Sequence, residues 1–317
     1  MTLRDAKGEI VPVRWSWASQ ADVSLAHARH QALYGRDASV AMKFGTAGHA
    51  AAFEPHRLVI YRGGDMTVTD AKGKVKVKTY TDVKQGAMWD AFKAAQAPDA
   101  VIVNAKEHAK VTAIAESLRR ADAARVDRET GEPLPLLFGP DVIRERRIVW
   151  TRNGRLCASI PDARNPGRWI ADLKLVRSAK PERFVRSATW MGYPGQLSFY
   201  AQADAADLRL AMPTADRYIV AVEPFAPYVV VTYKLTPRAV EFGDRQVDRC
   251  WDMIMSAEEV DHWPGYVDAI ADFDSDEPED EFGIIPADDP DLGADDAEND
   301  NHGDDGADDN RIDWSAA

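Results

Sequence analysis

The acidic side chains of this sequence are concentrated at one end, and this distribution limits which part of the chain can fold. Residues 271–317 contain 19 acidic side chains and a single basic one, Arg311. Such a segment cannot bury enough apolar surface to offset its conformational entropy, so we expect a disordered tail. Residues 1–270 keep 38 basic and 33 acidic side chains, and we expect them to form one α/β domain.

The uneven charge also changes what the overall balance implies about partners. The whole chain has a formal net charge of −13, whereas residues 1–270 alone are slightly basic. An acidic whole-chain charge therefore does not argue against binding to nucleic acid. Two cysteines are too few for a disulfide framework, or for a four-cysteine zinc or iron–sulfur site within one chain. With no signal-like or membrane-spanning apolar stretch, we expect a protein of the cytoplasm.

Local patterns predict alternating helices and strands. Residues 155–162 and 169–176 have the composition of strands and flank Asn165-Pro-Gly-Arg168, a strong turn signal. Residues 180–206 are predicted to be mostly helical, with an interruption at Pro194-Gly195. Further helices are predicted at about 41–53, 86–97, 105–124 and 237–255, and further strands at 57–61, 146–151, 217–222 and 228–235.

Residues 72–78, Lys-Gly-Lys-Val-Lys-Val-Lys, have a lysine at every second position. The alternation predicts a strand with Val75 and Val77 facing inward and Lys74, Lys76 and Lys78 facing outward. Two interpretations of this lysine ladder remain open. It is either an ordinary solvated strand face or an edge that follows the phosphates of a nucleic acid.

The residues that carry chemistry are Pro161-Asp162 and, after nine intervening residues, Asp172-Leu-Lys174. Asp172 and Lys174 are two apart on a predicted strand, so their side chains leave the same face. Carboxylates are hard oxygen ligands that suit Mg²⁺, and the ion activates water and acts as a Lewis acid. A lysine beside them can orient or deprotonate that water and balance charge on a phosphate. Alternatively, the two aspartates simply flank a surface hairpin.

Strand register decides between these possibilities. A two-residue loop at Asn165–Arg168 would set Asp162 opposite Ala171 and point Asp172 to the other side of the sheet. If both aspartates hold one metal ion, the connection must have odd register, through a bulge or a longer loop.

Three other features fit a site of this kind. Gln196 and Tyr200 share one face of a predicted helix at i,i+4 spacing. Gly45-Thr-Ala-Gly-His49 places an imidazole on a helix among small residues that permit close packing. Glu145 lies just before the strand that leads toward Asp162. Taken alone, His49 is more often a packed helix histidine than a ligand.

The ordered set GxxxH, E, PD, DxK and QxxxY resembles the PD-(D/E)XK nucleases of the RecB-like branch, and most closely the RecE-like exonucleases of phages and prophages. The resemblance covers about residues 15–266 and includes Asn153-Gly-Arg-Leu-Cys157 and Val220-Ala-Val-Glu-Pro-Phe-Ala-Pro-Tyr228. It implies a central mixed β-sheet flanked by helices and one or two Mg²⁺ or Mn²⁺ ions. It also implies homo-oligomers.

Residue roles follow from this resemblance. It makes Asp162, Asp172 and the carbonyl of Leu173 metal ligands, with His49 as a further ligand or near-ligand. Glu145 would bind a second metal ion or orient a ligand. It makes Lys174 the catalytic lysine, and Asp162 and Asp172 are catalytic residues beside it. Gln196 and Tyr200 would position DNA or the Lys174 region. Arg183 and Arg186, between the Lys174 strand and Gln196, are candidates for DNA contact.

The sequence departs from the family pattern at two positions near the motif. Ile160 stands where a basic residue is expected before Pro161, and Leu175 stands where a threonine is expected after Lys174. A cation and a hydroxyl near the phosphates are therefore missing, which bears on affinity for substrate and not on the metal site.

The function expected on these grounds is a Mg²⁺-dependent deoxyribonuclease that resects duplex DNA ends for phage-type recombination in a bacterial cytoplasm, together with a single-strand annealing protein. Two alternatives are an endonuclease or nickase with the same metal site, and a recombination module that binds DNA without cutting it. The acidic tail could be a solubilising segment, a DNA mimic that competes for the basic channel, or a docking segment for a partner.

Overall fold

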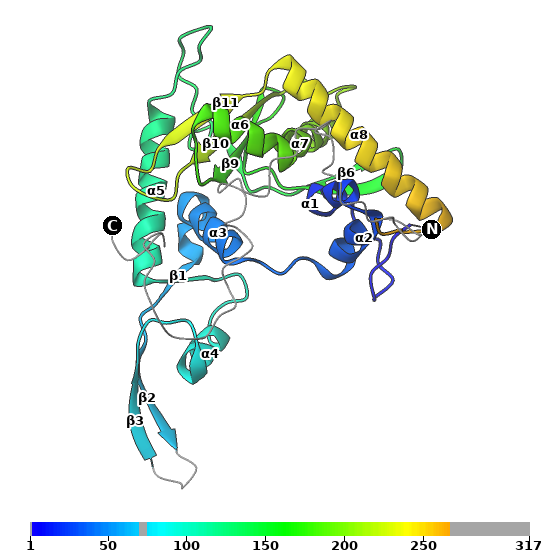
Figure 1. The fold of residues 1–317 in the computed structure, drawn as a ribbon. Coiled ribbons are helices and arrows are strands. Elements are labelled where there is room, and N and C mark those ends of the chain that lie inside the picture. Colours follow the sequence, from blue (N-terminus) through cyan, green and yellow to red (C-terminus); the bar gives the residue numbers. More distant parts are fainter. Residues whose placement is uncertain (1, 70–74, 267–317) are drawn as a thin grey trace, which may run out of the picture. The chain divides into compact units, whose positions relative to one another are not determined.

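A mixed β-sheet organises the part of the chain that the structure, a computed structural model, describes, residues 2–69 and 75–266 (Figure 1). Within this part, the residues up to Tyr266 form one compact unit. The predicted tail at 271–317 lies outside the described residues, so its disorder and the boundary at residue 270 remain predictions.

The strands of the described residues fall into one larger sheet and three pairs. In chain order they are β1 (Leu58–Tyr61), β2 (Gly64–Thr69), β3 (Val75–Tyr80), β4 (Val101–Asn104), β5 (Ile143–Arg144), β6 (Ile148–Arg152), β7 (Arg155–Ser159), β8 (Ala163–Asn165), β9 (Trp169–Leu175), β10 (Asp216–Val222) and β11 (Val230–Lys234). The larger sheet has the order β11-β10-β9-β8-β5. Only β9 and β10 pair in parallel within it, so the sheet is mixed, as expected.

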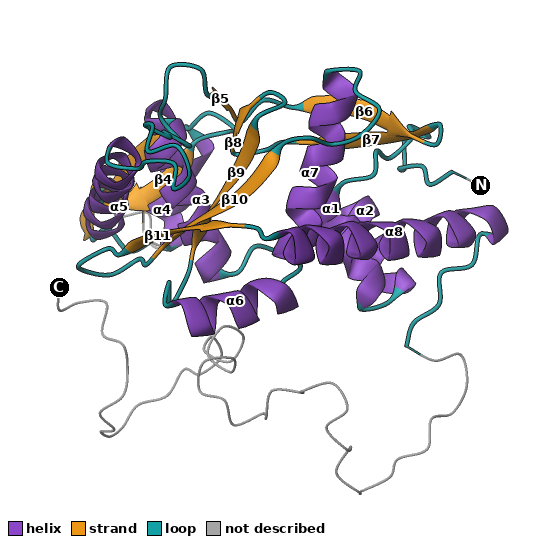
Figure 2. Ribbon diagram, turned by 90° about the horizontal axis from the view of Figure 1, so that it is seen from above, coloured by secondary structure: helices purple, strands orange, loops and turns teal. Residues whose placement is uncertain are grey.

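Helices cover both faces of this sheet. They are α1 (Trp15–Ala18), α2 (Leu25–Tyr34), α3 (Val40–Phe53), α4 (Gly86–Ala94), α5 (Ala105–Ala123), α6 (Pro181–Trp190), α7 (Tyr193–Asp207) and α8 (Pro237–Val260), with single 3₁₀ turns at Ser19–Asp22 and Pro55–Arg57. Figure 2 shows α3 and α5 on one side of the sheet and α6 and α7 on the other. None of the described helices is long and apolar enough to cross a membrane.

Alternation along β9 divides the core into two layers. Leu173 packs with Ile114 and Leu118 of α5 on one face of the sheet. Ile170 packs with Phe184 of α6 and Leu197 of α7 on the other face. Because side chains alternate along a strand, Asp172 and Lys174 share the α6 and α7 face with Ile170.

The register of β8 and β9 is the odd one that a shared metal site requires. Ala163 lies opposite Ala171 and Asn165 opposite Trp169, so three residues, 166–168, connect the strands. Extending this register by one residue sets Asp162 opposite Asp172. The prediction of a longer connection is therefore confirmed.

Three local predictions were wrong. The predicted strand 155–162 is too long, because β7 ends at Ser159 after pairing with β6, and a separate strand, β8, begins at Ala163 in the larger sheet. The break in residues 180–206 lies at Gly192, whose φ of 70° ends α6, while Pro194 fits the first turn of α7, where no N–H is needed. The valines of the lysine ladder are the third case.

Val75 and Val77 do not face a core. They are 62% and 68% exposed on β3, and among residues 2–69 and 75–266 this strand pairs with β2 alone, in a hairpin. Strict alternation identifies a strand but does not show that a layer packs on its apolar face. Lys74 lies outside the described residues, whereas Lys76 and Lys78 are exposed on β3.

Candidate active site

Three carboxylate residues meet at one end of the mixed sheet. Glu145 follows β5, Asp162 precedes β8, and Asp172 lies in β9, and these three strands are neighbours. Since β8 runs antiparallel to both of the others, the end of β5, the start of β8 and the end of β9 lie together. The backbone N–H of Glu145 donates to the carbonyl of Asp162 at 3.1 Å, which fixes the two segments side by side.

Because β8 begins only at Ala163, side chains replace its ladder hydrogen bonds at Leu173. The Leu173 N–H donates to Oδ2 of Asp162 at 2.7 Å. The Leu173 carbonyl accepts from Nε2 of His49 at 3.0 Å. This carbonyl, predicted to be a metal ligand, therefore orients His49 in the described structure.

Helix α3 brings His49 this close because Gly48 has no side chain. A Cβ atom at Gly48 would lie 2.5 Å from Cδ2 of Leu175 on β9. Leu175 is also the residue that replaces the expected threonine after Lys174. Its side chain packs against α3, which gives the departure from the family pattern a structural role.

The His49 ring points its other nitrogen at two carboxylates. A carbonyl can only accept, so the proton of this hydrogen bond is on Nε2. The Nδ1 atom then lies 3.7 Å from both Oε1 of Glu145 and Oδ2 of Asp162. One potential ligand atom from each of these three residues lies within 4.8 Å of the others.

Asp172 does not belong to this three-residue set and instead pairs with the predicted catalytic lysine. Lys174 Nζ lies 2.6 Å from Oδ2 of Asp172 and donates to Oε1 of Gln196 at 3.0 Å. Gln196 Nε2 donates in turn to the hydroxyl of Tyr200 at 3.0 Å. The ammonium also lies 4.6 Å from the centre of the Tyr193 ring, a cation–π contact.

Burial and mutual repulsion perturb the ionisation of these groups. Burial and the neighbouring carboxylate of Asp172 raise the pKa of Asp162 to about 7. Burial alone would lower the pKa of His49, but Asp162 and Glu145 outweigh it and raise the value to about 9. For Lys174, burial is likewise outweighed by the charge of Asp172, and the pKa is raised.

The residues present fit a divalent cation. Asp172 is only 2% exposed, and apart from the nearby ammonium of Lys174, no group in the described part of the chain donates a hydrogen bond to its carboxylate oxygens. Asp162 and Glu145 add two carboxylates beside it, and His49 offers Nδ1. Hard oxygen donors with an imidazole whose other nitrogen is held by a carbonyl form a suitable ligand set for Mg²⁺ or Mn²⁺.

The structure thus brings together most of the residues predicted from the sequence. Arg183 and Arg186 are the exceptions, because both lie on the exposed side of α6. Tyr193 was not predicted. It precedes Gln196 by three residues and Tyr200 by seven, so the helical stripe that relates those two residues contains the signal for it.

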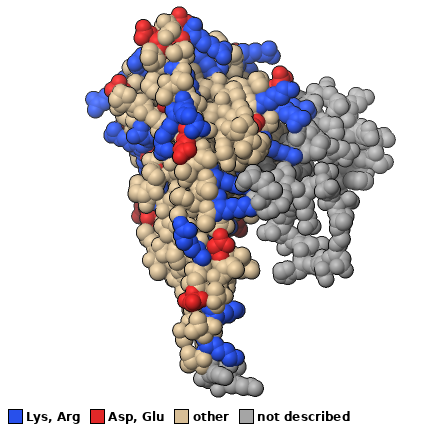
Figure 3. Space-filling model, turned by 90° about the vertical axis from the view of Figure 1, so that its left-hand side faces the viewer, with Lys and Arg blue, Asp and Glu red and all other residues tan. Residues whose placement is uncertain are grey.

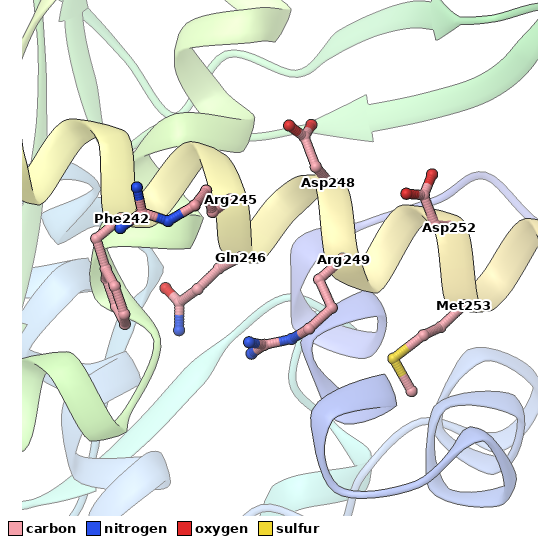
Figure 4. Close-up of a pocket in the computed structure, with 7 residues that line it drawn as sticks. All are labelled: Phe242, Arg245, Gln246, Asp248, Arg249, Asp252 and Met253. Carbon is pink, nitrogen blue, oxygen red and sulfur yellow. The ribbon is translucent and has the colours of Figure 1, made fainter.

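A pocket along α8 contains none of the predicted site residues (Figure 4). Figure 4 shows Gln246 and Arg249 pointing to one side of α8 and Asp248 to the other. These side chains make structural contacts: Gln246 accepts from the N–H of Gly195, Arg249 pairs with Asp22, and Asp248 pairs with Arg152. The chemistry-bearing groups are at the end of the sheet and not in this pocket.

Comparisons with known proteins agree with this geometry. No curated protein sequence matches the chain. One solved structure, from Eubacterium rectale and named "Putative exonuclease", is similar in fold with a TM-score of 0.50 and 11% identity, covering 84% of this chain and 91% of that one. A family model described as "PDDEXK-like domain of unknown function (DUF3799)" matches residues 19–275. Since that match includes most of the sequence and the whole candidate site, this protein belongs to that PDDEXK-like family.

Proposed function

We propose that this protein is a divalent-metal-dependent DNA exonuclease that resects duplex ends for phage-type homologous recombination. The observation that carries the proposal is the Asp172–Lys174 pair, 2.6 Å apart, beside the cluster of His49, Glu145 and Asp162. A buried carboxylate paired with an ammonium beside further carboxylates suits hydrolysis of a phosphodiester and is costly in a protein that only binds DNA.

In this mechanism Asp162, Asp172 and Glu145 would hold the metal ion, with His49 as a further ligand. When bound, the ion supplies a Lewis acid and lowers the pKa of a coordinated water. Gln196 and Asp172 fix the ammonium of Lys174 from two directions, which leaves a third N–H for a phosphate oxygen or the attacking water. Tyr200 holds Gln196, and the ring of Tyr193 supports the ammonium.

The surroundings of the site suit a phosphate backbone. Arg144, Arg146 and Arg147 are exposed and flank Glu145 at the end of β5. On the face drawn in Figure 3, which includes the β2–β3 hairpin, Lys and Arg side chains are also more abundant than Asp and Glu. Basic side chains around a carboxylate centre would bring a polyanion to it.

Digestion of two DNA substrates tests the proposal. With Mg²⁺, the wild-type chain should release nucleotides from an end-labelled linear duplex and leave a covalently closed circle intact, because an exonuclease needs an end. The label also reports the polarity of digestion. Cutting of the circle would instead support the endonuclease or nickase. Binding of both substrates without hydrolysis, with either Mg²⁺ or Mn²⁺, would reject the enzyme and support a non-cutting module.

The biological setting belongs to the same proposal. A resecting exonuclease would leave single strands for an annealing protein and would act in the cytoplasm of a bacterial host, encoded by a phage or prophage. Assembly into homo-oligomers is proposed from the family resemblance. Sedimentation of the purified chain tests the assembly, since a monomer at micromolar concentration would contradict it.

A further inference from the structure

Helix α6 carries an exposed tryptophan on the same stripe as two arginines. Arg183, Arg186 and Trp190 are spaced at i, i+3 and i+7, so they follow one side of the helix. Phe184 and Ala188 are buried on the opposite side. Trp190 is 71% exposed, which is unusual for the largest side chain of a folded domain.

The helix that carries this stripe packs beside the candidate active site, and the stripe itself faces solvent on the other side of that helix. Helix α6 packs on the sheet face that bears Asp172 and Lys174, through Phe184. The ring of Phe184 is 6.4 Å from the ring of Tyr193, and the Tyr193 ring is 4.6 Å from the ammonium of Lys174. One aromatic layer therefore separates α6 from the catalytic lysine.

The composition of the stripe favours a strand of nucleic acid over an apolar partner. Guanidinium groups bind phosphates, and a flat exposed indole stacks on any base. The only acidic residue of α6, Glu182, forms an ion pair in which its Oε2 lies 3.7 Å from Nζ of Lys180. A strand that leaves Lys174 and passes round to the exposed side of α6 would meet positive charge and a stacking surface.

We propose that the stripe formed by Arg183, Arg186 and Trp190 binds unpaired nucleotides of a DNA end, with Trp190 stacked on a base and the arginines on phosphates. This inference rests on the proposed function and specifies its substrate as an end with an unpaired strand. Stacking by one aromatic residue is worth about 5- to 100-fold in affinity.

Binding can be measured without hydrolysis. Fluorescence anisotropy of the full chain in EDTA would use three labelled probes: a duplex with a single-stranded overhang, the same probe with abasic sites in the overhang, and a blunt duplex. Trp190→Ala should weaken binding to the first probe about 5- to 100-fold and leave the abasic probe unchanged, while Trp190→Phe keeps most of the affinity. Arg186→Ala should weaken binding of every probe that places a phosphate beside this side chain. It should also make the affinity for DNA less dependent on salt concentration.

A control variant shows whether the effect is specific to Trp190. Tyr34, on α2, is an aromatic residue that is 78% exposed, and Tyr34→Ala should not change binding. Equal affinity of wild type and Trp190→Ala for the overhang would overturn the proposal. A change in oligomeric state on sedimentation, with unchanged DNA affinity, would also overturn it and assign the patch to contacts between copies. Because the binding assay contains no metal ion, its result does not depend on hydrolysis. Failure of the wild type to digest DNA in the separate assay with Mg²⁺ or Mn²⁺ would contradict the proposed function without deciding this one.

Discussion

At the scale of single residues, the candidate site concentrates negative charge that the described chain does not balance. Asp162, Asp172 and Glu145 face one lysine and one histidine, and burial makes the repulsion between the two aspartates stronger. Such a cluster destabilises the folded chain and is relieved when a cation binds. This loss of stability is evidence that the residues serve a function. It also predicts that a bound metal ion raises the free energy of unfolding.

Divalent metal should stabilise the wild-type chain and not a variant with one carboxylate fewer. At a concentration of Mn²⁺ 100 times its dissociation constant, linkage predicts a gain of about 2.7 kcal/mol in the free energy of unfolding. Asp162→Asn should lose most of this gain, whereas Asp252→Asn, on the exposed side of α8, should keep it. Chemical denaturation with Mn²⁺ and with EDTA measures both. An equal gain in the Asp162→Asn variant would remove Asp162 from the metal site.

The two cysteines should be inert in the folded chain. Burial raises the pKa of Cys157 to about 11, and burial together with Asp22 raises that of Cys250 to about 12. A raised pKa means less thiolate, so at pH 8 roughly one Cys157 thiol in 10³ is ionised, and fewer at Cys250. Iodoacetamide should modify neither residue until the chain is unfolded in guanidinium. Rapid modification of the folded chain would contradict the burial of both thiols.

Several site residues could be predicted from sequence because their spacing within one element fixes their side. Asp172 and Lys174 are two apart on a strand, and Gln196 and Tyr200 four apart on a helix. The pairing of Asp162 with Leu173 could not be predicted, because it depends on where β8 begins. The role of the Leu173 carbonyl in holding His49 depends in turn on the close approach of α3.

At the scale of elements, packing between helices depends on where a side chain is absent. A Cβ atom at Gly243 of α8 would lie 2.4 Å from the carbonyl oxygen of Pro194 on α7. A backbone atom cannot rotate away, so the two helices would have to separate. Gly45 of α3, by contrast, has nothing within 4 Å of the position a Cβ would take.

These two glycines predict opposite effects of the same substitution. Gly243→Ala should lower the free energy of unfolding by about 1–3 kcal/mol, the usual cost of overpacking, partly offset by better helix propensity. Gly45→Ala should raise it by about 0.5–1 kcal/mol, because only the propensity changes. Urea unfolding of both variants beside the wild type measures the difference. Destabilisation of similar size in both would contradict the contact between α7 and α8.

The limits of sequence patterns differ from element to element. The hairpin of β10 and β11 and the helix α8, with Thr236 as its N-cap, were predicted because turn and cap signals are local. The strand predicted at 155–162 was too long because nothing in the local sequence shows that β7 ends at Ser159 and that the chain then enters a different sheet as β8. The alternation of the Lys74–Lys78 ladder indicated a strand but could not show that Val75 and Val77 are exposed on it.

At the scale of the whole molecule, the charge of the tail opposes that of the rest. Residues 271–317 carry 19 acidic side chains, whereas residues 1–270 have a net charge of +5. Three roles follow for the tail: a solubilising segment, a partner docking segment, or a competitor for DNA. Only the last changes DNA affinity of the isolated protein.

Deletion of residues 271–317 tests whether the tail competes with DNA. If the tail occupies the basic surface, the truncated chain should bind DNA more tightly at ~0.05 M salt, and the gain should shrink toward ~0.3 M salt as charges are screened. Anisotropy titrations of both chains across this salt series measure the effect. Equal affinities throughout would reject competition and leave the other two roles.

The central claim is that the Lys174 ammonium, held by Asp172 and Gln196, acts in hydrolysis of DNA by this PDDEXK-like protein. The most direct measurement is the rate of Mg²⁺-dependent digestion of a linear duplex by wild type, Lys174→Ala and Lys234→Ala, the last removing an exposed ion pair with Asp216. We predict a loss of at least ~10²-fold for Lys174→Ala, as for other positioned proton donors, and none for Lys234→Ala. A folded Lys174→Ala variant that digests DNA at the wild-type rate would contradict the account.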